Sequence, residues 1–162
     1  MLLGDTLAQT RRREVSANLN ATTPYGASYN TASNAAIYLL LARIAMGALF
    51  IVPAIRQITG YAGSVKYFAS LGFPAPEAMV VLAVVIEIVA GVMIILGWKT
   101  RWAAWLLILY VIIATAMAHR FWQFPEAQQF NQLNHFLKNF AVIGALLYMI
   151  TFGPGRIAVE KT

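Results

Sequence analysis

The sequence predicts an all-α integral membrane protein, an antiparallel bundle of four transmembrane helices with short amphipathic segments in its outer loops. Of its 162 residues, 60% are hydrophobic and 11% are charged, and the mean hydropathy is +0.66. A soluble domain has roughly 45–50% apolar and about 25% charged residues. Four apolar segments each approach the ~20 residues that a membrane helix needs. The basic residues beside them place both termini in the cytoplasm.

The composition also excludes several classes of function. There is no cysteine, so the chain has no thiolate for a metal, an iron–sulfur cluster or dithiol chemistry. The net charge is +6, but no basic stripe with interleaved aromatic residues is present, and we expect no nucleic-acid partner. The sequence contains no Walker loop, dinucleotide fingerprint or nucleophile elbow. Any redox function therefore needs a bound cofactor or a partner protein.

Three parts follow one another along the chain. Residues 1–34 form a polar arm, residues 35–159 a membrane domain, and residues 160–162 a short tail. The arm is rich in Ser, Asn and Thr and has no apolar periodicity, which predicts a cytoplasmic segment without regular structure. The arginines at 11–13 are followed by polar residues, so they indicate a cytoplasmic anchor rather than a secretory signal.

The four membrane helices are expected at residues 35–58, 76–98, 102–119 and 135–152. Small residues should lie where these helices cross, notably Gly47, Gly91 and Gly144. Lys66 and Arg120 are the basic residues of the outer loops. The expected cytoplasmic side carries the larger set: Arg11, Arg12, Arg13, Lys99, Arg101, Arg156 and Lys161.

Both outer loops contain more than a simple turn. Residues 61–71 carry aromatic and aliphatic residues at helical spacing, which predicts a short helix on the membrane surface. Residues 121–130 are aromatic and polar and are interrupted by Pro125. Either the two loops form an aromatic belt in the headgroup layer, or they cover an opening between the helices.

Two opposite charges lie in the middle of apolar segments, Arg43 in the first and Glu87 in the second. A charge at the centre of a membrane helix costs about 3 kcal/mol on insertion scales, so such residues face inward and find a partner. Each lies roughly 12 to 14 Å from the expected cytoplasmic boundary, at one depth on neighbouring helices. One interpretation is an ion pair that locks the two helices together. In the other, Glu87 exchanges a proton, or Arg43 holds an anion or a quinone carbonyl.

A second polar layer is expected at an outer mouth of the bundle. We expect Lys138 to reach lipid phosphate, whereas the amide of Asn139 needs a partner on another helix or in a ligand. Haem is disfavoured because both histidines lie at the membrane edge, and a metal lacks a third ligand. No covalently bound cofactor is expected; a quinone or a lipid is the compatible ligand class. The residues of this mouth are Arg56, Glu77, His119, His135, Lys138 and Asn139.

Seven stretches of the chain carry a resemblance to a known family: 42–50, 60–76, 86–91, 96–101, 119–122, 135–140 and 152–156. In this order they resemble the DoxX family of small four-helix bacterial inner-membrane proteins, including its DoxD-like members. The resemblance covers about residues 35–159, and Pro53 stands in a stretch that departs from the family pattern and should kink the first helix.

This resemblance implies a multi-pass protein of the bacterial inner membrane that is associated with redox systems, and it assigns no catalytic residue. Three functions stay open. The first is an accessory subunit of a respiratory or photosynthetic type of assembly, which contacts other membrane subunits through its arm and helix faces and lines a quinone or lipid site. The second is a small proton-coupled transporter, a homo-oligomer with Glu87 as coupling carboxylate. The third is a subunit of a quinone-linked membrane oxidoreductase. We do not expect the chain to be catalytic alone.

Overall fold

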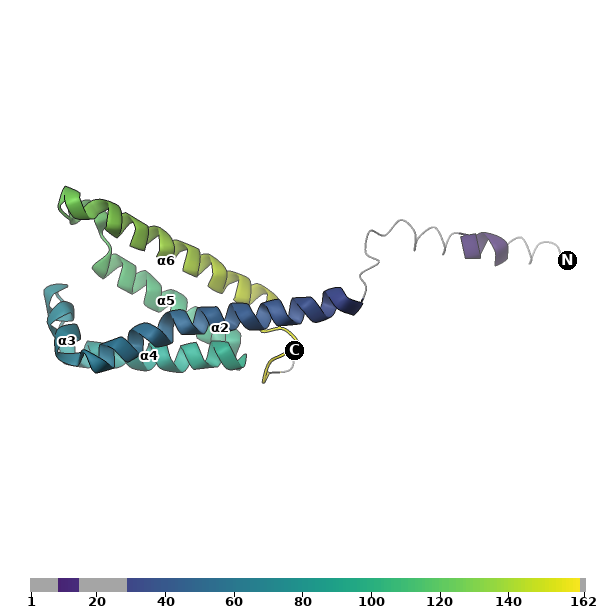
Figure 1. The fold of residues 1–162 in the computed structure, drawn as a ribbon, viewed down its shortest axis with the longest axis horizontal. Coiled ribbons are helices and arrows are strands. Elements are labelled where there is room, and N and C mark those ends of the chain that lie inside the picture. The colour runs from purple at the N-terminus through teal and green to yellow at the C-terminus, as the bar shows by residue number, and fades with distance from the viewer. Residues whose placement is uncertain (1–8, 15–28, 161–162) are drawn as a thin grey trace. The chain divides into compact units, whose positions relative to one another are not determined.

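The computed structural model describes residues 9–14 and 29–160 of the chain (Figure 1). The chain divides into two compact units, Met1–Ala35 and Ala36–Thr162. In the first unit, residues 9–14 are helical, although the sequence predicted an irregular arm. Gln, Arg and Glu are good helix formers, which accounts for this turn. Residues 15–28 of the predicted arm lie outside the described residues.

The described elements are all helical, with no strand among residues 9–14 and 29–160. In chain order they are α2 (Tyr29–Thr59), α3 (Tyr61–Ser70), α4 (Pro76–Leu96), α5 (Thr100–Ala118), the 3₁₀ helix η1 (Phe121–Gln123) and α6 (Glu126–Phe152). Four segments are long and apolar enough to cross a membrane: Asn34–Thr59, Pro76–Leu96, Thr100–Gln123 and Glu126–Phe152. The prediction of an all-helical chain with four membrane-capable helices is confirmed.

Two helices begin more than five residues earlier than hydropathy predicted. Helix α2 begins at Tyr29 rather than residue 35, and α6 begins at Glu126 rather than residue 135. The first turns of α6 are polar but rich in Glu, Ala and Gln, which favour helix, and Glu126 complements the helix dipole. Apolar length therefore located the apolar part of each helix but not its polar extension. Helix α4 ends at Leu96, where Gly97 adopts a left-handed conformation with φ 69°.

Helices α2 and α4 approach closely at Gly47 and Gly91. A Cβ at Gly47 would lie 2.7 Å from the carbonyl oxygen of Gly91, and a Cβ at Gly91 would lie 2.9 Å from Cγ1 of Ile51. Only glycine permits backbones to approach this far. By contrast, a Cβ at Gly144 would meet nothing within 4 Å, so the predicted close crossing at Gly144 is wrong.

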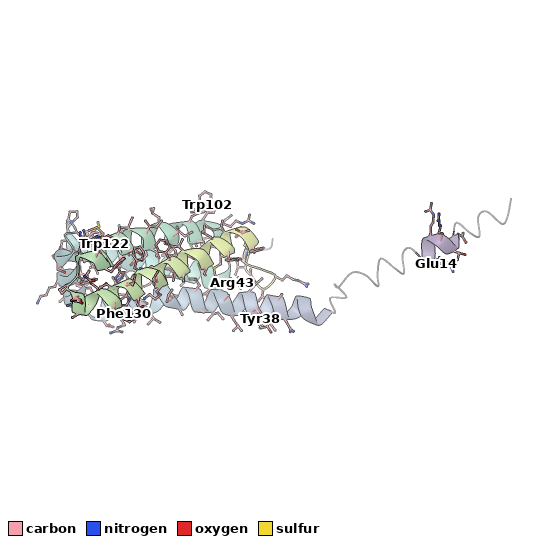
Figure 2. The ribbon with its side chains drawn as sticks, turned by 90° about the horizontal axis from the view of Figure 1, so that it is seen from above. Glu14, Tyr38, Arg43, Trp102, Trp122 and Phe130 are labelled. Atoms are coloured by element: carbon pink, nitrogen blue, oxygen red, sulfur yellow. The ribbon has the colours of Figure 1, made fainter. Side chains whose placement is uncertain are left out.

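The buried core of the second unit joins α2, α4, α5 and α6. Phe50, Ile94, Leu107 and Leu146 belong to it. Outside this core, large apolar side chains cover the exposed faces, and Figure 2 shows Trp102 projecting from the helices. Such a surface is typical of helices that contact lipid.

After α6, the chain returns to the end of α4. The amide of Val159 donates to the carbonyl oxygen of Leu96 at 3.0 Å, and that of Glu160 donates to Gly97 at 3.1 Å. Lys99 Nζ lies 3.7 Å from Glu160 Oε1. The last carbonyls of a helix need partners outside it, and this C-terminal segment, residues 153–160, supplies them for α4.

Candidate functional site

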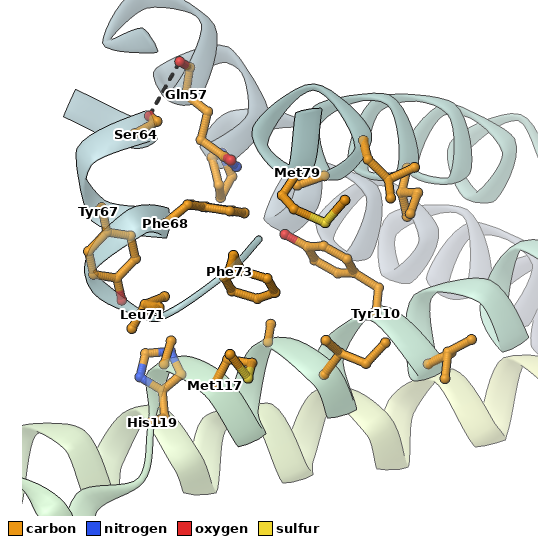
Figure 3. A pocket seen from close by; sticks show the side chains of 18 of the residues that line it. Gln57, Ser64, Tyr67, Phe68, Leu71, Phe73, Met79, Tyr110, Met117 and His119 are labelled. Carbon is orange, nitrogen blue, oxygen red and sulfur yellow. Dashed lines mark hydrogen bonds between the residues drawn. The ribbon is translucent and has the colours of Figure 1, made fainter. Parts of the chain in front are cut away.

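A cavity of about 500 Å³ lies among α2, α3, α4 and α5 (Figure 3). Its wall is mainly aliphatic and aromatic, a composition suited to an apolar ligand. The polar residues in the wall are Gln57, Ser64, Tyr67, Tyr110 and His119. The apolar ones are Pro53, Phe68, Leu71, Phe73, Met79, Leu82, Ala83, Ile86, Leu106, Leu109, Ile113, Ala114, Met117 and Ala118.

Glu87 lies directly behind the polar part of this wall. Gln57 Nε2 donates to its Oε2 at 2.6 Å, and Tyr110 Oη donates to its Oε1 at 2.7 Å. The carboxyl group is almost fully buried, with 5% of the residue exposed. Hydrogen bonds to a carboxylate are among the strong ones in proteins. Glu87 therefore holds one residue of α2 and one of α5 in place, and both face the cavity.

Helix α3 and the turn after it cover one side of the cavity. Tyr67, Phe68 and Phe73 contribute to the wall, and the rings of Phe68 and Phe73 stack at a centroid distance of 5.2 Å. Figure 3 shows Phe73 facing Tyr110 and Met117 of α5, with Phe68 above it, whereas Tyr67 lies on the side of Leu71 and His119. Burial raises the pKa of Tyr67, so its hydroxyl stays protonated at physiological pH. The short helix predicted at residues 61–71 is confirmed as α3.

Arg43 does not form the expected ion pair with Glu87. Its Nη2 donates instead to the carbonyl oxygen of Ile157, and a Cβ at Gly97 would clash with its Nη1. At a rise of 1.5 Å per residue, Gly97, just after the end of α4, lies about 15 Å from Glu87 along the axis of that helix. The contact of Gly47 with Gly91 fixes how α2 and α4 are aligned along their lengths. Arg43 and Glu87 therefore lie at different depths in the bundle. Arg43 is 2% exposed, and its Nε and Nη1 have no hydrogen-bond partner in the described part of the chain.

Four of the predicted outer-mouth residues come together between α5 and α6. The rings of His119 and His135 stack at 5.0 Å, and Lys138 Nζ lies 3.5 Å from His135 Nδ1. Asn139 Nδ2 donates to Thr115 Oγ1 at 2.8 Å. Asn139 thus has a partner across the helices, one of the two alternatives that the sequence left open for its amide. His119 alone of these four lines the cavity.

The two remaining mouth residues lie apart from the histidines. Arg56 lies in the last turn of α2, and Glu77 lies in the first turn of α4. The backbone carbonyl of Glu77 accepts a hydrogen bond from Tyr61 Oη at 3.5 Å. Neither side chain bonds to the His119–His135 pair. Within residues 9–14 and 29–160, no group of three His, Asp or Glu side chains could hold a metal ion.

The sequence did not single out Tyr110 as a site residue. Gln57 was not singled out as a site residue either. A signal for Tyr110 was present, because its hydroxyl is a polar group in the middle of an apolar segment and must find a partner there. The partner was not predictable, since it depends on the rotation of α5 against α4.

The fold and the cavity define a helical membrane protein with a buried carboxyl group behind an apolar site. The chain belongs to the DoxX family, whose model matches residues 38–120. It is 37% identical over 126 residues to "Inner membrane protein YphA" of Escherichia coli strain K12, a match that covers 77% of this chain and 89% of that protein.

Two further relatives extend the comparison. "Inner membrane protein YqjF" of the same strain is 31% identical over 123 residues, 76% of this chain and 89% of that protein. "Putative oxidoreductase CatD" of Bacillus subtilis strain 168 is 36% identical over 62 residues, 38% of this chain and 45% of that protein. No solved structure matches.

Proposed function

We propose that this DoxX-family protein is an accessory subunit of a redox or energy-converting assembly, of respiratory or photosynthetic type, in the bacterial inner membrane. In this role its cavity holds a quinone or a lipid-like molecule. The observation that carries the proposal is the apolar cavity of about 500 Å³ whose polar wall is fixed by Glu87. Ligand sites are typically cavities of roughly 300–1,000 Å³ with a few polar groups in an apolar wall.

The hydrogen-bonding groups of the wall fit a quinone ring. Gln57 Oε1 is buried and has no partner in the described part of the chain, so it can accept from the hydroxyl of a quinol. Tyr67 Oη makes no hydrogen bond among the described residues and can donate to a carbonyl. When bound, a quinone supplies the two-electron redox chemistry. The chain itself binds the ring, keeps water out and holds a proton at Glu87 or Tyr110.

The proposed topology is an antiparallel bundle with both termini in the cytoplasm. It rests on the distribution of Lys and Arg, and the names of two relatives support the inner membrane as the location. The polar arm at residues 1–34 would then face cytoplasmic parts of a partner.

Affinity purification tests this proposal. The full chain, tagged at its C-terminus, is extracted from native membranes in mild detergent, and its co-purifying proteins and bound quinone are quantified. We expect redox subunits in a fixed ratio and bound quinone. The variant Ala114→Phe should lose the quinone because Ala114 lines the cavity. Its control is Ala141→Phe, at an exposed position of α6. A lone homodimer without quinone would contradict the proposal.

A proton-coupled transporter is the second candidate, favoured by the surroundings of Glu87. Both of its partners are neutral donors, and no cation lies within salt-bridge distance of it in the described part of the chain. A carboxyl group so placed can exchange a proton without breaking an ion pair. Four helices are few for alternating access, so this function requires a symmetric oligomer. Reconstituted vesicles with a pH-sensitive dye would show proton movement that Glu87→Gln abolishes.

A third candidate is a subunit of a quinone-linked oxidoreductase. The partial similarity to "Putative oxidoreductase CatD" supports it. The same purification distinguishes it from the first candidate, because a catalytic subunit would reduce or oxidise added quinone together with its partner.

A further inference from the structure

A second, smaller pocket lies at the N-terminus of α5, at the opposite end of that helix from the cavity. Its volume is about 200 Å³, and its lining is mostly polar. The loop between α4 and α5 and the C-terminal segment form it together. The lining residues are Lys99, Thr100, Arg101, Trp102, Pro154 and Glu160.

Unpaired donors converge on this pocket. The first backbone bond of α5 runs from the amide of Ala103 to the carbonyl of Lys99, and the three amides between them make no hydrogen bond within the described part of the chain. Such free amides, at the positive end of the helix dipole, favour an anion. Thr100 adds an independent observation. It is 1% exposed, and its Oγ1 has no partner among the described residues. A buried hydroxyl without a partner is rare in a native fold, and a bound ion or ligand that reaches it would satisfy it.

The charges of the pocket are mainly positive. Arg101 Nε donates to the carbonyl of Ile150 at 3.0 Å, so its two terminal nitrogens are left for another acceptor. Lys99 Nζ is 3.7 Å from Glu160 Oε1, an exposed pair of small energetic value. The buried guanidinium of Arg43 lies against Gly97, two positions before Lys99, and has no carboxylate partner in the described residues. Two cations and one carboxylate thus line the pocket, and the buried charge of Arg43 lies behind it.

Aromatic residues place this pocket at the depth of lipid headgroups. Trp98 is 49% exposed and Trp102 is 74% exposed, and tryptophan collects at the membrane–water interface. We propose that the pocket binds a phosphate group, either of an anionic lipid or of a free phosphate. Lys99, Arg101, Thr100 Oγ1 and the amides at the start of α5 would hold its oxygens. Glu160 is a competing anion that the phosphate displaces from Lys99.

Native mass spectrometry of the delipidated full chain in detergent tests this site. Three probes are added separately: dioleoylphosphatidylglycerol, dioleoylglycerol with the same chains but no phosphate, and inorganic phosphate. Retention of phosphatidylglycerol alone would assign the site to lipid, and competition by inorganic phosphate would assign it to the phosphate group itself. Equal retention of dioleoylglycerol would overturn the proposal.

Two variants remove the proposed contacts. Lys99→Gln should weaken phosphatidylglycerol binding about tenfold, the usual value of a hydrogen bond to a charged group. Thr100→Val should weaken it too while raising the melting temperature of the ligand-free protein, because the substitution removes an unpaired buried hydroxyl. Lys66→Gln is the matched control for charge, and Thr59→Val is the control for the hydroxyl. Unchanged binding in both pocket variants would overturn the proposal.

The variant Glu160→Gln distinguishes binding at this pocket from a general attraction of anionic lipid to positive charge. Because it removes the competing carboxylate, it should tighten phosphatidylglycerol binding severalfold when Lys99 is present. When Lys99→Gln is also present, binding should stay weak. The Ala114→Phe variant should bind phosphatidylglycerol as the wild type does, because its cavity lies at the other end of α5. A result that contradicts the quinone proposal would therefore not contradict the phosphate site. A result that contradicts the phosphate site would likewise not contradict the quinone proposal.

Discussion

Tyr110 of α5 donates a hydrogen bond of 2.7 Å to the carboxyl group of Glu87 on α4, and the same tyrosine forms part of the cavity wall. Its ring packs edge-on against Phe50 of α2, with centroids 6.4 Å apart. A single side chain therefore connects three helices at the depth of the cavity. A substitution at Tyr110 therefore acts on the cavity wall and on the helix packing together.

The variant Tyr110→Phe tests how much the hydrogen bond from Tyr110 to Glu87 contributes to stability. The variant keeps the ring and removes the hydroxyl, so one oxygen of a buried carboxyl group loses its donor, at a cost of about 1–3 kcal/mol. We expect a lower melting temperature for the full chain in detergent. The control is Tyr148→Phe, because Tyr148 is exposed on α6. An equal effect of both substitutions would show that the bond contributes little.

Replacements of Glu87 should separate folding from ligand binding. Glu87→Gln can keep both contacts if the amide of Gln57 turns over, because Gln57 Oε1 has no partner now. Glu87→Leu leaves two buried donors unpaired, which costs about 1–3 kcal/mol for each. We expect the Gln variant to be inserted and folded but changed in quinone content, and the Leu variant to be depleted from membranes. Membrane abundance and extracted quinone are the two measurements.

If Glu87→Gln were as depleted as Glu87→Leu, the carboxylate charge itself would be needed for folding. The functional interpretation of Glu87 would then lose its support, since a lost activity could not be told from a lost protein.

Much of the fold followed from hydropathy, because roughly 20 apolar residues in a row have few alternatives to a membrane helix. The short helix α3 followed from its periodicity. The depth of Arg43 relative to Glu87 did not follow, because each was measured from an assumed boundary, whereas the contact of Gly47 with Gly91 sets the true register. The contact of Tyr110 with Glu87 was not predictable for a similar reason. The rotation of α5 about its own axis decides which of its polar atoms faces Glu87.

Two glycines should respond oppositely to substitution. Gly47→Ala would place a Cβ 2.7 Å from the carbonyl oxygen of Gly91, so α2 and α4 must separate. We expect a loss of about 1–3 kcal/mol, as is usual for overpacking. At Gly144 the added Cβ meets nothing within 4 Å, and alanine should stabilise α6 by roughly 0.5–1 kcal/mol. Thermal unfolding in detergent measures both. A destabilised Gly144→Ala would indicate a helix contact outside the single chain.

Arg43 should hold the C-terminal segment against the end of α4. Its guanidinium donates to the carbonyl of Ile157, next to the amides of Val159 and Glu160 that bond to Leu96 and Gly97. Arg43→Met keeps an unbranched side chain but removes this donor. Hydrogen exchange at residues 157–160 should become at least several-fold faster, while exchange in the middle of α4 stays slow, because the segment opens without unfolding the core. Lys66→Met serves as the control for the lost charge. Uniformly faster exchange over all helices would instead make Arg43 part of the global stability of the bundle, and unchanged exchange at residues 157–160 would show that the two amide bonds alone hold the segment.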